Sequence, residues 1–586
     1  MKQLNIKTIP TKIWTAFTFL FIISGCSDTL DPLERGWVDD EQLWKNISYT
    51  HAVLDQVYDN IQDDWVDQIG ISNDYYTDNA VHNSTESIYA TGGGSSSYYP
   101  IGEWSFAYTN ILQINYYLEN GLDVHFTGSD DELDSIAKAR YYGEAHFLRA
   151  WNESLLLKEY AGPVDAAGQQ IMGYPIVKKV YENDEYANLT RNTYDECVQS
   201  IIDDLDTAYI YLPQSYLNGI SVYDEEFRHG RATQKAALAL KARVLLYAAS
   251  EAYNPTNNNQ KWIDAAIAAY RAIQEDGGFQ TLEAYGEFDH TASEDHYWRT
   301  GYSASSSTLE NTHFPPSRYG KGECNPSQNL IDAFPMANGL PADLNDPNYI
   351  SNPYEGRDAR FYHFIAYNGD PMFGNFDPVE TFVDGADYNG VLRNNATRTG
   401  YYMKRFLSNI AVGNDPRKLD GETTSSQKFA VLLDREELYL NFAEAVNEIA
   451  GSDPKTALNE WGINHSAMDA LLAIRNREGL DNVDNTELTN SINTQEQFRE
   501  YIRNERRIEL CFRGHRYWDL RRWKIPIETI NNTVQGVMII KNEASGSFTY
   551  QTIDIEARNY ESNTYYGPIP YSEIAKSNRL VQNFGW

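Results

Sequence analysis

The sequence predicts a mainly α fold: a tetratricopeptide-like helical-repeat scaffold that carries one large loop-rich insertion. Amphipathic patterns, with apolar residues three or four positions apart, run from about residue 39 to 272 and resume after residue 428. Between residues 277 and 427 this periodicity is lost, and Gly, Asn, Asp, Ser and Pro are frequent. Irregular stretches of this length inside a compact domain are usually functional or contain short strands. We therefore expect two helical blocks separated by an insertion that holds a ligand site.

The N-terminal block is expected to form helices at about residues 40–61, 104–118, 133–160, 193–212, 231–250 and 262–274. The third stops at Gly162-Pro163, and the fourth starts at a capping Asn192 or Thr193 and ends at Pro213. The fifth is rich in Ala and Leu, which are strong helix formers, and its small Ala side chains favour close helix packing. No clean 34-residue period can be aligned, so the pattern alone leaves a bundle and a solenoid open.

The C-terminal block repeats the helical pattern. Helices are expected at about residues 429–449, 466–477 and 494–524, whereas residues 567–586 are expected to be loop-like. The one low-complexity patch, residues 92–97 (GGGSSS), indicates a flexible loop. Composition shows no clear linker between domains.

The N-terminus has the features of a lipoprotein signal peptide over residues 1–25. Lys2, Lys7 and Lys12 form a basic region, and residues 13–23 form an apolar segment that is too short to span a bilayer. The tetrapeptide at 23–26, ISGC, resembles a lipobox, so Cys26 is predicted to be lipidated and residues 26–36 to form a polar tether. The alternative is an ordinary secretory signal with a chance Cys.

The charge of the chain restricts its partners. It has 48 basic and 83 acidic residues, a net charge of −35. Nucleic acid is a poor fit because phosphate binding needs a basic face. An acidic surface also repels anionic ligands, so neutral ligands are expected.

Cysteines and motifs give no sign of catalysis or of a cofactor. Cys197, Cys324 and Cys511 are widely spaced, which fits neither a disulfide framework nor a zinc site. The sequence contains no HExxH, GxSxG, P-loop or CxxC motif. Residues 384–390 (DGADYNG) hint at a calcium loop, but the ligand spacing fails. We expect a protein that is not an enzyme and has no cofactor, with surface Ca²⁺ left open.

Several segments resemble the SusD/RagB family, and the strongest is residues 502–524, IRNERRIELCFRGHRYWDLRRWK. Others lie at residues 148–164, 231–247, 328–339, 356–361, 433–448, 472–480 and 566–573, the last together with residues 582–583 and 586. Ala359, Glu478 and Arg513 depart from the residues usual in the family. The match covers most of the chain after the signal peptide, and its strength lies in the number and order of the segments.

This resemblance implies a single SusD-like body over residues 37–586. Its parts would be a helical half (37–276), a ligand-binding insertion (277–427) and a C-terminal part with the signature (428–586). It also implies a lipid-anchored protein on the outer membrane at the cell surface. Such a protein captures neutral oligosaccharide or polysaccharide for a SusC-like TonB-dependent transporter. Peptide binding, as in RagB-like members, and a helical-repeat adaptor with only protein partners remain as alternatives.

A sugar site needs flat aromatic rings together with groups that bond vicinal hydroxyls. Members of the family present such rings from early loops and from the central insertion. By that resemblance Tyr297, Trp298 and Tyr319 are predicted platforms, and Asp74 and Arg318 are predicted hydrogen-bonding partners. The other predicted site residues, from the same loops, are Tyr76, Tyr302 and Cys324.

The signature segment is interpreted as structural. On a helix, Glu509 is expected to pair with Arg506 or Arg513, and Asp519 with Arg516 or Arg522. Such pairs, if exposed, are worth less than about 1 kcal/mol each. The aromatic residues of the segment are expected to pack inward, so no ligand is placed there.

Overall fold

The computed structural model describes residues 40–63, 70–84, 86–125, 131–216, 230–285, 293–301, 306–373, 377–390, 395–412, 425–449, 451–477, 484–577 and 579–586. The signal peptide, Cys26 and the tether predicted from the sequence therefore lie outside the described residues. Within the described part of the chain, no helix is long and apolar enough to cross a membrane.

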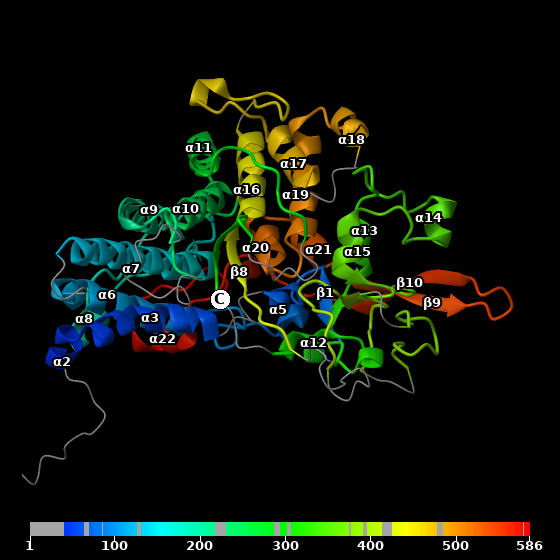
Figure 1. The fold of residues 1–586 in the computed structure, drawn as a ribbon, viewed down its shortest axis with the longest axis horizontal. Coiled ribbons are helices and arrows are strands. Elements are labelled where there is room, and N and C mark those ends of the chain that lie inside the picture. The colour runs from blue at the N-terminus through cyan, green and yellow to red at the C-terminus, as the bar shows by residue number, and fades with distance from the viewer. Residues whose placement is uncertain are drawn as a thin grey trace, which may run out of the picture.

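The N-terminal half is a stack of helices, drawn in blue to green in Figure 1. Helix α6 packs on α7, α7 on α9, α9 on α10 and α10 on α11, so the helical-repeat prediction is confirmed. The bounds are α2 Asp40–Lys45, α3 Ile47–Asp63, α5 Ile71–Asp74, α6 Trp104–Asn120, α7 Asp131–Tyr160, α8 Asn183–Tyr186, α9 Tyr194–Tyr211, α10 Gln234–Ala249 and α11 Asn259–Glu275. Short π and 3-10 turns lie at Tyr89–Gly93 and Gly121–Asp123.

Local signals set the ends of these helices. Thr193 caps α9 through its side chain, and the Glu196 side chain accepts from the Thr193 backbone N–H in return. Helix α7 ends at Tyr160, just before Gly162–Pro163, which form strand β2. Most of the Ala residues of α10 are buried, and this helix contacts both α9 and α11. The small side chains therefore permit the close packing that the sequence predicted.

The insertion consists of short elements joined by long loops, which explains why it shows no periodicity. Its helices are α12 Thr308–His313, α13 Gln328–Ala333, α14 Pro347–Ser351 and α15 Ala359–Phe364, with a 3-10 turn at Pro316–Arg318. Among the described residues up to 434, the strands are β1 Ala80–His82, β2 Gly162–Pro163, β3 Ile171–Met172, β4 His296–Arg299, β5 Cys324–Pro326, β6 Ile365–Ala366, β7 Tyr402–Met403 and β8 Val431–Asp434. Strand β4 pairs with β8, which closes the base of the insertion.

The C-terminal part departs from the prediction in three places. The helix expected at residues 429–449 begins as strand β8, and only Arg435–Glu448 is helical (α16). The stretch expected at 494–524 breaks between Glu509 and His515, where Phe512 and Gly514 are left-handed, with φ of 63° and 73°. The tail expected to be loop-like contains α22 Tyr571–Lys576. The remaining elements are η6 Asn459–Trp461, α17 Ala467–Arg475, α18 Thr486–Ser491, α19 Gln495–Glu509, α20 His515–Arg522, α21 Ile527–Ile530, β9 Val534–Lys541, β10 Phe548–Glu556 and η7 Ser562–Tyr565.

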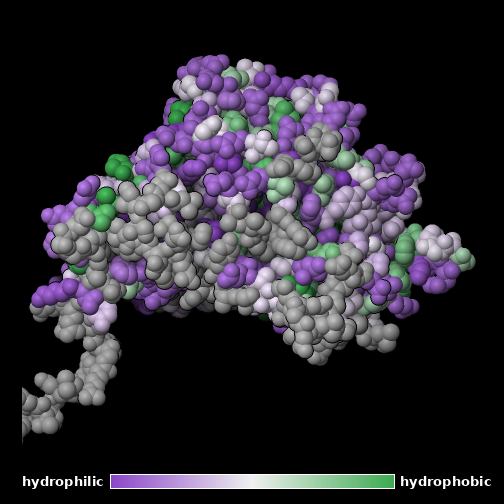
Figure 2. Space-filling view, in the orientation of Figure 1, coloured by the Kyte–Doolittle hydropathy of each residue, from purple (hydrophilic) through white to green (hydrophobic). Residues whose placement is uncertain are grey.

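The hairpin of β9 and β10 projects from one side of the molecule (Figure 1). Helices α16, α17 and α19 form a second group that joins the first through the contact of α16 with α11. The face shown in Figure 2 is mostly hydrophilic, with small separate apolar spots, in keeping with the acidic composition.

The signature segment is a buried network of ion pairs. Asp519 pairs with Arg506 at 2.9 Å and with Arg522 at 2.8 Å, so its pairing with Arg522 agrees with the prediction. Glu509 instead bonds Arg360 of the insertion at 2.9 Å and Arg477 at 3.0 Å, which corrects the expected pairing within the segment. These groups are buried. The small contribution to stability that is usual for exposed ion pairs therefore does not apply to them.

Candidate functional site

The early loops and the insertion meet along a short strand pair. Strand β1 pairs antiparallel with β5, with His82 opposite Cys324 and Ala80 opposite Pro326. The Asn83 side chain strengthens this junction, because its amide donates to the carbonyls of Lys321 (2.7 Å) and Asn395 (2.8 Å). Two segments that are more than 200 positions apart therefore form one surface, which we call the β1–β5 surface.

The early loop is also held to the signature helices. The Asp78 carboxylate accepts from Nε and Nη2 of Arg516, each at 2.9 Å, and pairs with Arg507 at 3.1 Å. Burial opposes ionisation of Asp78, but the two guanidinium groups outweigh it and hold the pKa of this carboxyl well below its usual value. The signature thus positions the loop that carries the candidate site.

Tyr319 is the exposed ring of this surface. Its side chain is 46% exposed, and its backbone is left-handed, with φ 65°, a conformation that is unusual for a bulky residue. The turn before it is anchored: the Asp387 carboxylate accepts from Ser317 N and Oγ at 2.9 and 2.7 Å. A conformation of this kind persists only where its surroundings enforce it, and such sites are often functional. The turn therefore presents a flat ring to solvent in a fixed position.

Polar side chains follow Tyr319 closely along the chain. Glu323 Oε2 lies 3.6 Å from His82 Nε2, and Glu323 Oε1 lies 3.5 Å from Lys321 Nζ. A hydrogen bond with His82 lowers the pKa of Glu323, so the carboxylate stays an acceptor at neutral pH. His82 packs edge-on against Tyr75, with ring centroids 5.6 Å apart. A ring beside acceptors and donors of this kind can stack on an apolar ligand face and bond its hydroxyls.

Comparison with known proteins assigns the chain to a family. The family described as SusD matches residues 286–586. A second family, described as starch-binding and associating with the outer membrane, matches residues 39–246. The chain belongs to the SusD family. No match was found among the curated proteins compared.

Solved structures share this SusD fold along nearly the whole chain. A SusD-like protein from Bacteroides fragilis is 24% identical with a TM-score of 0.71, covering 94% of this chain and 99% of its own. A SusD-like carbohydrate-binding protein from the same species is 19% identical with a TM-score of 0.66, covering 92% and 99%. A laminarin-binding SusD-like protein is 16% identical with a TM-score of 0.56, covering 93% and 100%. At these identities the likeness shows the fold alone.

Two of the rings predicted as platforms lie in the core of this SusD fold. Trp298 is 2% exposed, and its ring packs edge-on against Phe147 and Trp151 at 4.8 and 4.7 Å between centroids. Tyr297 is also buried and donates from its hydroxyl to Asp276 at 2.8 Å. Neither ring has a free face for a sugar, so their prediction as platforms is corrected. Strand β4 carries both into the helical half, where apolar area is buried.

Three other predicted residues are buried as well. Arg318 donates to the carbonyl of Asp377 at 2.7 Å, so it braces the turn before Tyr319. Cys324 is buried in β5, and burial raises the pKa of its thiol, which makes it an inert apolar residue. The Asp74 carboxylate accepts from the Phe512 backbone N–H at 2.5 Å. These three are corrected from ligand partners to supports.

The last two predicted residues have different outcomes. Tyr76 is half-buried and lines a cavity of about 410 Å³ between the early loops, α7 and α20, so its role as a ligand contact stays a prediction. Tyr302 lies outside the described residues.

Sequence reasoning missed His82, Lys321 and Glu323. Each lies within a few positions of a predicted segment, but only the pairing of β1 with β5 brings them together. Among the described residues, no group of His, Cys, Asp and Glu side chains is arranged to hold a metal ion.

Asp74 gives a pH-dependent prediction. Burial raises the pKa of its carboxyl from 3.8 to about 7. The folded-state pKa of Asp74 lies above its unfolded value. The stability that the protonated carboxyl contributes is therefore fully present below about pH 4 and is lost as the pH rises through about 7. Asp74→Asn keeps an acceptor for the Phe512 N–H. Its free energy of unfolding is expected to exceed that of the parent by roughly 2–4 kcal/mol at pH 8, but not at pH 4.

Thermal unfolding at the two pH values measures this difference. Asp554→Asn, at an exposed position of β10, is the matched control and should show little change at either pH. An equal effect of Asp74→Asn at both pH values would show that Asp74 does not titrate in the folded protein.

Proposed function

We propose that this protein is a cell-surface binding protein that captures a neutral glycan on the β1–β5 surface. The observation that carries the proposal is the exposed Tyr319 ring, held on an anchored turn beside Glu323 and Lys321. The strongly acidic chain supports a neutral ligand. The descriptions of the second matching family and of several structural neighbours, which name starch, laminarin and carbohydrate, support the ligand class.

The proposed site would bind a sugar without breaking or forming covalent bonds. Tyr319 would stack on the apolar face of a sugar ring, while Glu323 accepts from one hydroxyl and Lys321 donates to its neighbour. The proposal therefore describes capture and release of an intact saccharide. Release of shorter products from a polysaccharide by the purified protein would contradict it.

The proposal includes a lipid anchor at Cys26 and delivery of the glycan to a SusC-like TonB-dependent transporter in the outer membrane. Two or more acyl chains give durable attachment to a membrane. A full-length protein that is recovered without lipid in the soluble fraction would contradict the anchor, and failure to co-purify with such a transporter would contradict the delivery.

Tyr319→Ala is the test of the site. Removing an anchor ring costs about 2 kcal/mol, which corresponds to roughly 10- to 30-fold weaker binding. Calorimetric titration of the chain from Ser27 with maltohexaose, laminarihexaose and a peptide mixture measures the effect.

Tyr571→Ala removes another exposed Tyr, on α22, and should bind as the parent does. Equal affinity of the parent and Tyr319→Ala for a sugar would remove Tyr319 from the site. Saturable binding of peptides, without binding of either sugar, would show that the protein captures peptides and would contradict the glycan proposal.

A further inference from the structure

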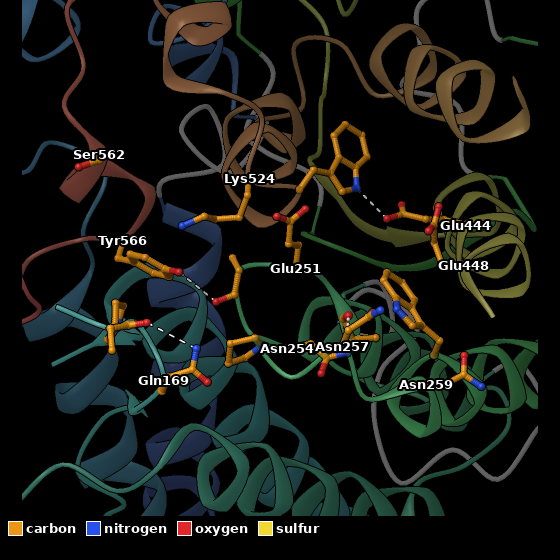
Figure 3. Close-up of a pocket in the computed structure, with 18 of the residues that line it drawn as sticks. Gln169, Glu251, Asn254, Asn257, Asn259, Glu444, Glu448, Lys524, Ser562 and Tyr566 are labelled. Carbon is orange, nitrogen blue, oxygen red and sulfur yellow. Dashed lines mark hydrogen bonds between the residues drawn. The ribbon is translucent and has the colours of Figure 1, made fainter. Parts of the chain in front are cut away.

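A large cavity lies away from the β1–β5 surface. It has a volume of about 1250 Å³ and opens between the turn that joins α10 to α11, the helices α16 and α19, and the C-terminal segment (Figure 3). Ligand pockets commonly measure about 300–1,000 Å³. This cavity, which we call the C-terminal cavity, is therefore large enough for several sugar rings.

Aromatic rings line the C-terminal cavity. The Tyr566 hydroxyl donates to the Ala252 carbonyl at 3.0 Å, and Trp523 Nε1 donates to Glu444 at 2.7 Å. Phe584 is 54% exposed and its backbone is held by a 2.7 Å bond from its N–H to the Pro163 carbonyl. The Tyr566 ring is thus held at its hydroxyl, which lowers the entropy lost when a ligand stacks on it. Phe584 offers a second, exposed ring on an anchored backbone.

Two opposite charges in the same cavity have no ion-pair partner among the described residues. Lys524 Nζ lies over the Tyr565 and Tyr566 rings, 4.3 and 5.3 Å from their centroids. Burial lowers the pKa of Lys524, and the negative charge of Glu251 opposes this shift. The two side chains therefore interact electrostatically. Glu251 is exposed to solvent, and Figure 3 shows it between Lys524 and Asn254. Among the other lining charges, Glu448 pairs with Arg499 at 2.6 Å, Glu444 with Arg522 and Glu500 with Arg503. Asp165 accepts from the backbone N–H of Gln170 at 3.0 Å.

This chemistry favours a neutral ligand over an anion. An ammonium beside a carboxylate suits two neighbouring hydroxyls, one that accepts and one that donates. The lining carboxylates, Asp165, Glu251, Glu444, Glu448 and Glu500, outnumber the lining cations, Arg499, Arg503 and Lys524. An anionic ligand would therefore meet net repulsion.

We propose that the C-terminal cavity is a second saccharide site, in which a neutral oligosaccharide stacks on Tyr566 and Phe584 and bonds Glu251 and Lys524 through vicinal hydroxyls. The ligand class rests on the proposed function, but the location does not. The helices that border this cavity, α11, α16 and α19, lie in the upper part of Figure 1, whereas α12, next to the Tyr319 turn, lies at its lower edge. Two separate sites would let one protein hold a long chain at two points, which raises avidity without new contacts at either site.

Hydrogen exchange locates binding directly. The chain from Ser27 is compared with and without maltohexaose and laminarihexaose, each at millimolar concentration, with a peptide mixture as a third probe. At least one of the two sugars is expected to slow exchange in residues 249–259 and 562–568, and to do so in Tyr319→Ala as well. In the Tyr319→Ala chain, the added substitutions Glu251→Gln and Phe584→Ala are each expected to weaken the remaining sugar binding roughly 5- to 10-fold, the loss of one polar or stacking contact.

Glu355→Gln is the matched control, because Glu355 is exposed and lies outside the cavity. Protection by a sugar of residues 314–324 alone would overturn the second site and leave the proposed function intact. Protection of 249–259 and 562–568 alone would support the second site and overturn the Tyr319 site. Protection of neither region by a sugar, or of the cavity by peptides alone, would overturn the saccharide assignment of the cavity.

Discussion

Arg360→Met is expected to lower the free energy of unfolding by about 3–5 kcal/mol. The Arg360 side chain is 1% exposed and bonds three carboxylates, those of Asp358 (2.9 Å), Glu505 (2.7 Å) and Glu509 (2.9 Å). Met fills a similar volume but leaves these buried carboxylates without that cation, so they must be protonated or exposed. Urea unfolding of the two proteins measures the difference.

Lys576→Met is the control for this substitution. Lys576 forms an exposed pair with Glu573 on α22, which is expected to be worth less than about 1 kcal/mol. If the two variants lost similar small amounts of stability, the network around Arg360 would not hold the insertion to α19.

Trp298→Ala is expected to cost about 3–5 kcal/mol of stability, because it leaves a cavity between the insertion and α7. Its indole ring contacts Phe147 and Trp151, and its Nε1 donates to the Gly230 carbonyl at 2.8 Å. Trp298→Phe keeps most of the volume and should cost less. Chemical unfolding gives the stabilities, and titration with sugar at a temperature where each variant stays folded gives the affinities.

The two measurements separate a core role from a binding role. If Trp298 is a core residue, the variants should lose stability while their folded fraction binds the sugar with unchanged affinity. Parental stability combined with lost sugar binding would restore Trp298 as a platform and would require β4 to lie differently.

The long helices of this protein were predictable because their signals are local. Thr193 and Glu196 form a capping box within one turn, and Gly162 and Pro163 end α7 directly. The break between Glu509 and His515 was missed, because a glycine inside an amphipathic pattern is tolerated in many helices. The left-handed φ of Phe512 and Gly514, which marks the turn, is visible only in the structure. The short strands of the insertion were also missed, since a strand of two to four residues exists only through its distant partner.

In the candidate site, too, some features could be predicted from local sequence and others depended on distant parts of the chain. Tyr319 is surrounded by turn-forming residues, so its position in a loop was readable from the chain. The aromatic run at 296–299 was equally suggestive, but its strand pairs with β8, and both Tyr297 and Trp298 are buried. Trp298 packs against Phe147 and Trp151 of α7, and Tyr297 bonds Asp276. An aromatic residue suits both a core and a sugar platform, and only the neighbours that cover it decide between them.

By itself, the sequence determined the helical class, most helix ends, the acidic character and the family of this chain. Each of these depends on composition, on local capping or on the order of short motifs. Tertiary structure alone decided that Glu509 pairs with Arg360 and Arg477, that Asp78 of the early loop pairs with the signature helices, and that Glu251 and Lys524 share a cavity. The physical reason is that burial and charge pairing depend on groups far apart in sequence, which no local pattern specifies.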